Sequence, residues 1–206
     1  IWINRVIIGW LGWELTNLAS WVGILSFLLF APTIITGPYF GVLIDRIDIK
    51  KFAVYTQSII SLTVFVLWFL YYFSFLNIYS LCLVALIIGI FTSADRTTRM
   101  AIVPRIVDKE YLANAIAVHG INFNCARLIG PALAGIMIKI FGFNTTIFIN
   151  FLFLIAMPLV LMVIEVRQRD SEKIFFLPLL IESLCLTSMV IEVRKRDSIS
   201  KGKKNI

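Results

Sequence analysis

The chain has 206 residues, of which 60% are apolar and only 15% charged, and its mean hydropathy is +0.93. Because soluble domains are usually about 45 to 50% apolar, this composition excludes an ordinary soluble domain and predicts a membrane protein. The net charge of +7 is explained by basic loops beside anionic lipid, so it gives no reason to expect a nucleic-acid partner.

Long stretches without charge give the first predicted spans, since a helix needs about 20 apolar residues to cross a membrane. Residues 1–13 are predicted to be the end of an earlier helix, and because the sequence does not begin with Met we expect that helix to be truncated. A complete span is predicted over Leu18–Ile44. The stretch from Phe52 to Ala94 is long enough for two helices that turn near Asn77 and Ser80.

The next predicted elements follow a basic loop from Arg96 to Glu110. A span over Leu112–Ile140 leads through the turn Gly142–Asn144 into the last clear span, Thr146–Ile164. The predicted fold class is therefore an all-α membrane protein with five complete spans and one partial span.

The segment after the last span carries a local duplication. Residues Met162–Ser171 recur as Met189–Ser198 with one substitution. A further membrane crossing there would place a strongly basic tail outside, against the positive-inside rule. We therefore predict a membrane bundle over residues 1–164 and a duplicated interfacial segment with a basic tail over residues 165–206.

Basic residues of the short loops collect on one side of the predicted membrane. They are Arg46, Lys50, Lys51, Arg96, Arg99, Arg105, Lys109, Arg167, Arg169 and Lys173. The opposite turns offer only Lys139. Since cytoplasmic loops carry the excess of lysine and arginine, these basic loops are predicted to be cytoplasmic.

The sequence offers no set of residues for metal or enzyme chemistry. His119 is the only histidine, and Cys82, Cys125 and Cys185 have spacings that match no zinc or redox pattern. The carboxylates are scattered, and a nucleotide-binding loop of the Gly-x-x-x-x-Gly-Lys type is missing. We expect no enzyme activity, no cofactor and no metal site.

The turn after the first complete span carries the most distinctive pattern, Gly41-x-x-x-Asp45-Arg46-x-x-x-Lys50-Lys51. It resembles the signature loop between the second and third transmembrane helices of the major facilitator superfamily of secondary transporters. In that family the loop braces two six-helix halves, and its acidic residue takes part in a conformational latch. The resemblance implies that role for these five residues, while a solvated loop that only sets topology is the alternative.

Two positions of this loop depart from the family pattern. Ile49 stands where arginine is usual, and Asp48 stands where glycine is frequent. The departures imply either a weakened latch or a substitution of the missing charge by Lys50.

The resemblance continues along most of residues 10–164. The start of the second helix at Trp21–Gly23, the start of the fifth at Leu112–Ala115 and the run Asn122–Gly135 are similar to bacterial drug and siderophore exporters of this superfamily. This similarity implies the N-terminal six-helix half of a transporter, with its first helix truncated.

Asp95, Arg96 and Arg99 lie at the predicted cytoplasmic end of the fourth helix. Four residues separate Asp95 from Arg99, so the two share one helix face. We predict a charge network from which an arginine could reach Asp45. Anchoring to lipid headgroups is an equal alternative.

The stretch Gly130-Pro131-x-x-Ala134-Gly135 resembles the antiporter motif of the fifth helix. Small residues permit close helix contact, and Pro131 can bend the helix. The family links this motif to export, which implies functional roles for Gly130, Pro131 and Gly135. A plain packing motif would explain the same residues.

Arg127 is a charged residue inside a predicted span, which makes it a functional-site candidate. It lies near Asn122 and Asn124, and all three are predicted to face a central cavity. Snorkelling of the Arg127 side chain toward the membrane surface is the alternative. The weaker cavity candidates are Asn4, Arg5 and Asn150.

The resemblance implies a multi-pass protein of the bacterial cytoplasmic membrane that transports a small molecule. The expected activity is secondary active, proton-coupled efflux of a small amphipathic molecule, a drug or a siderophore. The expected partners are the substrate, protons, the lipid bilayer and a missing C-terminal half-bundle. The alternative is a non-transporting truncated fragment, or a half-subunit that needs a second six-helix partner.

Overall fold

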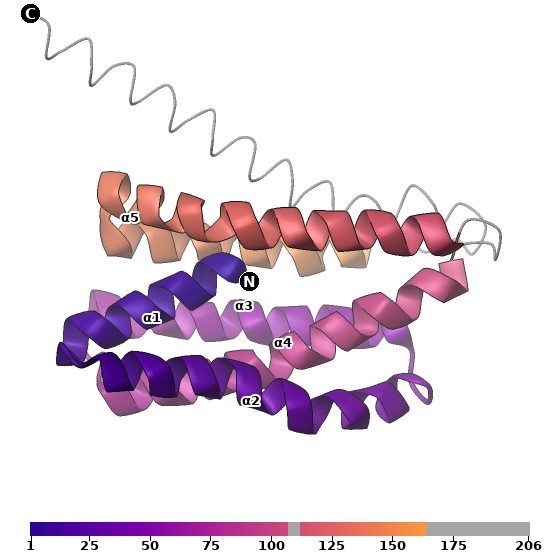
Figure 1. The fold of residues 1–206 in the computed structure, drawn as a ribbon, viewed down its shortest axis with the longest axis horizontal. Coiled ribbons are helices and arrows are strands. Elements are labelled where there is room, and N and C mark those ends of the chain that lie inside the picture. Colours follow the sequence, from indigo (N-terminus) through magenta and orange to yellow (C-terminus); the bar gives the residue numbers. More distant parts are fainter. Residues whose placement is uncertain (107–111, 164–206) are drawn as a thin grey trace, which may run out of the picture.

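The computed structural model describes residues 1–106 and 112–163, and this part of the chain is built from helices joined by short turns (Figure 1). The helices are α1 (Trp2–Thr16), α2 (Ala19–Ile44), α3 (Ile49–Tyr72), α4 (Ile78–Ile106) and α5 (Leu112–Val163). This agrees with the predicted all-α fold class. The predicted interfacial segment and tail, residues 165–206, lie outside the described residues.

Helix α5 consists of two antiparallel passes rather than one long rod. At about 1.5 Å per residue, its 52 residues would far exceed the roughly 30 Å of a hydrocarbon core. Gly142 interrupts the helix with φ 78° and ψ 170°, a conformation that glycine adopts without a side-chain clash. Figure 1 shows the chain reversing there, with the second pass behind the first. The predicted turn at Gly142–Asn144 is thus confirmed.

Two other short turns lie at the same end of the bundle as Gly142. Asn17 ends α1 in the left-handed conformation, and its backbone N–H donates to the carbonyl of Trp13 at 2.7 Å. Before α4, the Ser80 hydroxyl accepts from the backbone N–H of Asn77 at 3.0 Å and donates to the Asn77 carbonyl at 2.7 Å. The predicted helical hairpin therefore turns where the sequence indicates.

Helix α4 is longer than predicted, because it continues to Ile106. The expected basic loop from Arg96 to Glu110 is therefore wrong in its first part. Arg96 and Arg99 lie on the helix itself, where Arg99 forms an ion pair one turn back with Asp95. The predicted placement of both arginines on the fourth helix is confirmed, whereas a loop that begins at Arg96 is not found.

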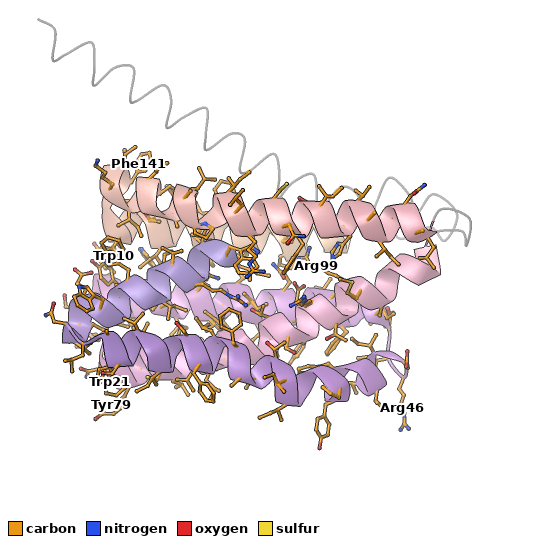
Figure 2. The ribbon with its side chains drawn as sticks, in the orientation of Figure 1. Trp10, Trp21, Arg46, Tyr79, Arg99 and Phe141 are labelled. Carbon is orange, nitrogen blue, oxygen red and sulfur yellow. The ribbon has the colours of Figure 1, made fainter. Side chains whose placement is uncertain are left out.

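Four of the described helices, α2 to α5, are long and apolar enough to cross a membrane. Aromatic side chains mark one end of this bundle. Figure 2 shows Trp10, Trp21, Tyr79 and Phe141 at the end with the Gly142 turn, while Arg46 lies at the opposite end. Aromatic residues favour membrane interfaces, and basic residues favour the cytoplasmic side. We call the aromatic end the outer end and the Arg46 end the inner end.

The apolar core occupies the outer half of the bundle and joins all five helices. Its buried members are Ile7, Ile8, Leu11, Leu25, Leu29, Ile60, Val64, Leu67, Leu81, Val84, Ala85, Ile88, Ile147 and Leu154. Helix α2 packs closely on α4 at Gly89, where an added Cβ would lie 2.6 Å from the backbone oxygen of Leu28. Small residues allow such close backbone contact between membrane helices.

Candidate functional site

A cavity of about 210 Å³ lies between α1, α2, α4 and the first pass of α5, on the inner side of the apolar core. Its charged lining residues are Arg5, Asp95, Arg96, Arg99 and Arg127. Among the described residues, four cationic side chains therefore share the cavity with a single carboxylate. The cavity is strongly positive for a site within a membrane bundle.

Aromatic rings hold the arginine from α1. The guanidinium of Arg5 lies 4.5 Å from the ring centre of Trp2 and 3.9 Å from that of Phe30. Stacking of this kind stabilises a guanidinium by about 0.5 to 2 kcal/mol, depending on how far it is removed from water. The apolar neighbours thus orient the Arg5 side chain in the cavity.

Arginines from α4 and α5 stack in the same way. Arg96 lies 4.9 Å from the ring centre of Phe123, and Arg127 lies 5.6 Å from that of Trp2. The two rings are themselves in edge contact, with their centres 5.5 Å apart. A connected aromatic cluster therefore brings together three arginines from three helices.

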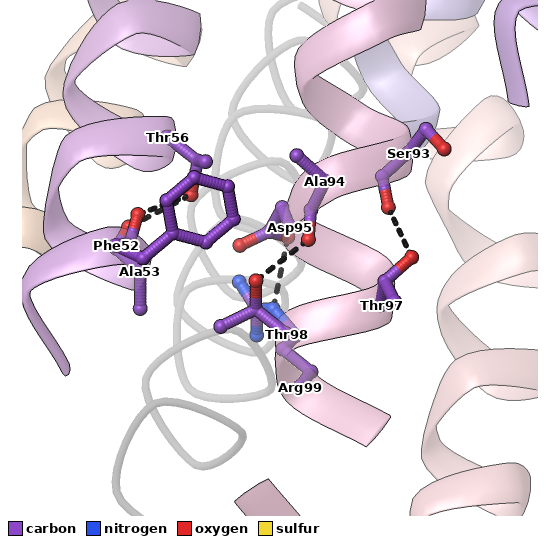
Figure 3. A network of polar contacts seen from close by, with 9 residues as sticks. All are labelled: Phe52, Ala53, Thr56, Ser93, Ala94, Asp95, Thr97, Thr98 and Arg99. Atoms are coloured by element: carbon purple, nitrogen blue, oxygen red, sulfur yellow. Dashed lines mark hydrogen bonds and ion pairs between the residues drawn. The ribbon is translucent and has the colours of Figure 1, made fainter. Parts of the chain in front are cut away.

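Asp95 and Arg99 form an ion pair in the wall of the cavity. The Nε of Arg99 donates to a carboxylate oxygen of Asp95 at 2.9 Å, and Asp95 is only 4% exposed. Figure 3 shows the pair beside the hydroxyl groups of α3 and α4, and Figure 2 shows Arg99 within the bundle. The predicted placement of Asp95 and Arg99 on one helix face is confirmed, and the structure adds the ion pair between them.

Three predicted cavity candidates have different positions. Asn122 lines the cavity beside Arg127. Asn124 lies on an exposed part of α5, where its amide donates to the carbonyl of Gly120 at 2.9 Å. The amide of Asn150 is buried and donates to the side-chain oxygen of Asn4, which ties the second pass of α5 to α1. Neither Asn124 nor Asn150 is among the residues that line this cavity.

The antiporter-like motif is only partly in contact with the rest of the bundle. An added Cβ at Gly130 would lie 2.8 Å from Cβ of Trp2, so this glycine lets α1 approach α5. Pro131 lies inside the helix one residue later. A Cβ at Gly135 would meet no atom within 4 Å. Gly130 therefore supports the cavity by positioning Trp2, whereas the Gly135 position is open.

The loop between α2 and α3 lies at the inner end, outside the cavity. Asp45 and Arg46 are exposed, and a Cβ added at Gly41 would meet no atom within 4 Å. Asp48 accepts from the backbone N–H of Lys51 at 3.4 Å, which caps the start of α3. The side chain of Lys50 lies outside the described residues.

Sequence reasoning underestimated the contribution of α1 and of the aromatic residues. Arg5 was only a weak candidate, and Trp2, Phe30 and Ser93 were not singled out, yet all four line the cavity. Arg5 lies three residues after an aromatic residue in an apolar helix, a spacing that places both on one helix face. That spacing is the signal that could have found the site.

Comparisons with known proteins show which family the chain belongs to. The profile of a family described as transmembrane secretion effector matches residues 1–187. The staphyloferrin A transporter of Staphylococcus aureus (strain NCTC 8325 / PS 47) is 27% identical over 146 residues, which are 70% of this chain and 37% of that protein. No solved structure matches the chain significantly.

Two macrolide efflux proteins A are similar to the same part of the chain. The one from Streptococcus pyogenes is 27% identical over 139 residues, 68% of this chain and 34% of that protein. The one from Enterococcus faecalis is 25% identical over 144 residues, 70% of this chain and 45% of that protein. The chain thus spans less than half the length of these relatives, and it belongs to the transmembrane secretion effector family of major facilitator superfamily transporters.

Proposed function

We propose that the chain is the N-terminal half-bundle of a secondary active transporter, which exports a small amphipathic molecule from the bacterial cytoplasm in exchange for protons. The drug or siderophore class of substrate is supported by the names of the relatives, a staphyloferrin A transporter and macrolide efflux proteins. The second half-bundle would supply the opposite wall of the transport path.

The observation that carries this proposal is the open, charged side of the cavity. Arg96 and Arg127 line the cavity and are exposed in the half-bundle. A charge in contact with hydrocarbon is unfavourable, so charged residues in membrane helices face water or protein. A second half-bundle across the cavity would enclose these arginines around a transport path near the bilayer midplane.

The loop at the inner end supports a latch between two half-bundles. Asp45 follows directly after α2, and its exposed position leaves it accessible to a partner surface. The helix dipole disfavours a carboxylate at a helix C-terminus, so a specific basic partner or helix N-terminus would stabilise it. Gly41, one turn earlier, leaves room for that partner. Arg46, Lys50 and Lys51 would supply the positive charge of the same latch.

The charge network and the motif on α5 would couple this latch to export. Asp95 is the only carboxylate among the described residues that line the cavity, which makes it the candidate proton carrier on this side. Its partner Arg99, together with Arg96, would respond to a change of its charge. Pro131 and the open position at Gly135 would let α5 move against the second half-bundle.

The proposal is tested in cells of the native host, with the gene intact or deleted. Accumulation of a macrolide, of staphyloferrin A and of the cationic dye ethidium is measured in each strain. Deletion should raise the retention of at least one compound, and a protonophore should abolish the difference between the strains. Equal retention of all three compounds, with and without the protonophore, would contradict the proposed export.

The latch is tested in the same cells by comparing two carboxylates of one loop. Asp45→Asn should reduce export by about tenfold or more, since a charge-assisted hydrogen bond contributes about 1.5 to 3 kcal/mol. Asp48→Asn is the control, because asparagine caps a helix as well as aspartate does and the same charge is removed. Equal export by both variants, at equal amounts of membrane-inserted protein, would show that Asp45 only sets topology.

A further inference from the structure

The cavity has positive charge for which this part of the chain provides no anion. Asp95 is already paired with Arg99. For Arg5, Arg96 and Arg127 the contacts found among the described residues are with aromatic rings, and no described carboxylate lies within ion-pair distance of them. Repulsion from Arg96 and Arg127 also acts on Arg5. An anion between the three would remove this repulsion.

The way in which the rings hold these arginines leaves their donors available. An aromatic ring contacts the flat face of a guanidinium, whereas the N–H groups point outward from its edge. Those edges form a planar fork that matches the two oxygens of a carboxylate. The guanidinium groups of the three arginines are held by Trp2, Phe30 and Phe123, so they are preorganised for binding an anion.

Buried hydroxyl groups in the same wall also lack partners. Ser93 is 2% exposed and lines the cavity, yet its hydroxyl has no hydrogen bond within the described part of the chain. The hydroxyl of Thr92 and one terminal nitrogen of Arg5 are also buried without a hydrogen bond in the described part of the chain. A buried polar group without a hydrogen bond is unfavourable, so a ligand with several acceptor oxygens would stabilise this wall.

We propose that this cavity binds the anionic end of the transported molecule, and that the substrate is a solute with two or more carboxylate groups. This inference rests on the proposed transport function and names its substrate class. The excess of three cationic side chains over the Asp95–Arg99 pair favours more than one negative charge. A cationic solute would meet positive charges from α1, α4 and α5.

The size of the cavity limits how much of the solute it holds. Its volume of about 210 Å³ is below the roughly 300 to 1,000 Å³ of pockets that enclose drug-sized ligands. The cavity therefore takes one end of the solute, and the remainder extends toward the open side. A lipid headgroup phosphate offers the same oxyanion chemistry, and the experiment separates the two sources.

The test is isothermal titration calorimetry on the full chain in lipid nanodiscs of phosphatidylcholine, with citrate as the probe. Trimethyl citrate, which has the same skeleton without charge, and ethidium are titrated in parallel. Two variants each remove one positive charge from α5. Arg127→Gln alters the cavity, whereas Lys139→Gln alters an exposed position about 18 Å farther along the helix.

Citrate should bind the unaltered chain, and added salt should weaken the binding because part of it is electrostatic. Arg127→Gln should weaken it by about tenfold to a hundredfold, the effect expected for a hydrogen bond to a charged group. Lys139→Gln should leave it within about twofold, since exposed charges at that distance are screened. Circular dichroism and the melting midpoint check that the variants fold alike, and Arg96→Gln provides a second cavity variant.

Several results would overturn the inference. They are absence of citrate binding, equal binding of trimethyl citrate, stronger binding of ethidium, or equal weakening by the Arg127 and Lys139 variants. Nanodiscs with added phosphatidylglycerol test the lipid source. If that lipid abolishes citrate binding and is retained by the unaltered chain but not by Arg127→Gln, the cavity holds a headgroup and the inference is wrong.

The export assay separates this inference from the proposed function. Export of ethidium or a macrolide alone, without citrate binding, would support the proposed transport function and reject the proposed anionic substrate. Citrate binding that depends on Arg127, together with equal retention of all compounds in both strains, would uphold the anion site and reject export.

Discussion

The outer and inner halves of the bundle are held together by different interactions. The outer half is packed by aliphatic side chains such as Ile7, Leu25 and Leu81, which have no exposed surface. The inner half buries polar side chains of α3, α4 and α5, namely Thr56, Gln57, Ser61, Ser93, Asp95, Thr98 and His119. Close packing resists small displacements, so the outer half is the rigid part of this bundle.

Two of the buried hydroxyl groups of the inner half form hydrogen bonds within their own helices. Thr56 donates to the carbonyls of Phe52 and Ala53, and Thr98 donates to that of Ala94, all within one turn (Figure 3). A hydroxyl bonded to its own helix needs no partner across the interface. The helices of the inner half can therefore shift against one another without losing these bonds, which suits the part of a transporter that has to open and close.

The largest expected effect tests which end faces outward. In a variant without the native cysteines, single cysteines at the exposed positions Asn77 and Asn144 should react fully with an impermeant thiol reagent in intact cells. A cysteine at Asp48 should react only after the membrane is permeabilised, because the basic inner end is expected in the cytoplasm. Labelling of position 48 in intact cells would show that the inner end faces outward. The assignment of these helices to the helices of the family would then be wrong.

The rigidity of the outer half is tested at Gly89. A leucine there would force α2 and α4 apart, because the nearest atoms belong to the backbone of Leu28 and Leu29. Overpacking usually costs about 1 to 3 kcal/mol, and we expect the upper end or more because a backbone cannot rotate away. The measurement is the melting midpoint and the yield of monodisperse protein in detergent.

Gly23→Leu is the matched control for that change. A Cβ added at Gly23 would meet no atom within 4 Å. The free energy of unfolding of this variant should therefore lie within about 0.5 kcal/mol of that of the unaltered chain. Equal losses of stability in both variants would mean that any added side chain in these helices is destabilising. The close packing of α2 on α4 would then not explain the rigidity of the outer half.

The smallest expected effect concerns the ion pair in the inner half. Asp95→Asn leaves the Arg99 guanidinium beside a neutral amide and should cost about 1.5 to 3 kcal/mol, because a hydrogen bond between charged groups is lost. The double variant Asp95→Asn with Arg99→Gln should regain part of this loss, since the charge that Asp95 balances is removed as well. Thermal unfolding of the two single variants and the double variant forms a double-mutant cycle. A double variant that loses the sum of the single effects would show that the pair is not coupled.

The sequence predicted the turns of this fold well because each has a local cause. Gly142 adopts a positive φ, and Asn77 and Ser80 bond to each other across the first turn of α4. The inner end of α4 was predicted less well. A cluster of arginines is typical of a loop, and only the tertiary arrangement shows that Arg96, on α4, contacts the Phe123 ring of α5 and lines the cavity.

The cavity could be predicted only in part for the same reason. Arg127 and Asn122 were identified because polar residues stand out in an apolar span, and both line the cavity. The side-chain bond between Asn4 and Asn150 joins residues that are 146 positions apart, so no local pattern indicates that they turn to each other. The role of Asp48 as a helix cap could have been predicted from the sequence, since aspartate directly before a helix is a standard capping signal.

The short connection between α1 and α2 is a point about which a tilt of α1 would displace Arg5. Only Asn17 and Leu18 separate the two helices, and α1 is fixed at that outer end while Arg5 lies about 18 Å away along its axis. A tilt of about 10° around this turn would displace Arg5 by about 3 Å, the length of one hydrogen bond. The distance of Arg5 from Arg96 and Arg127 therefore depends on the angle of a single short helix.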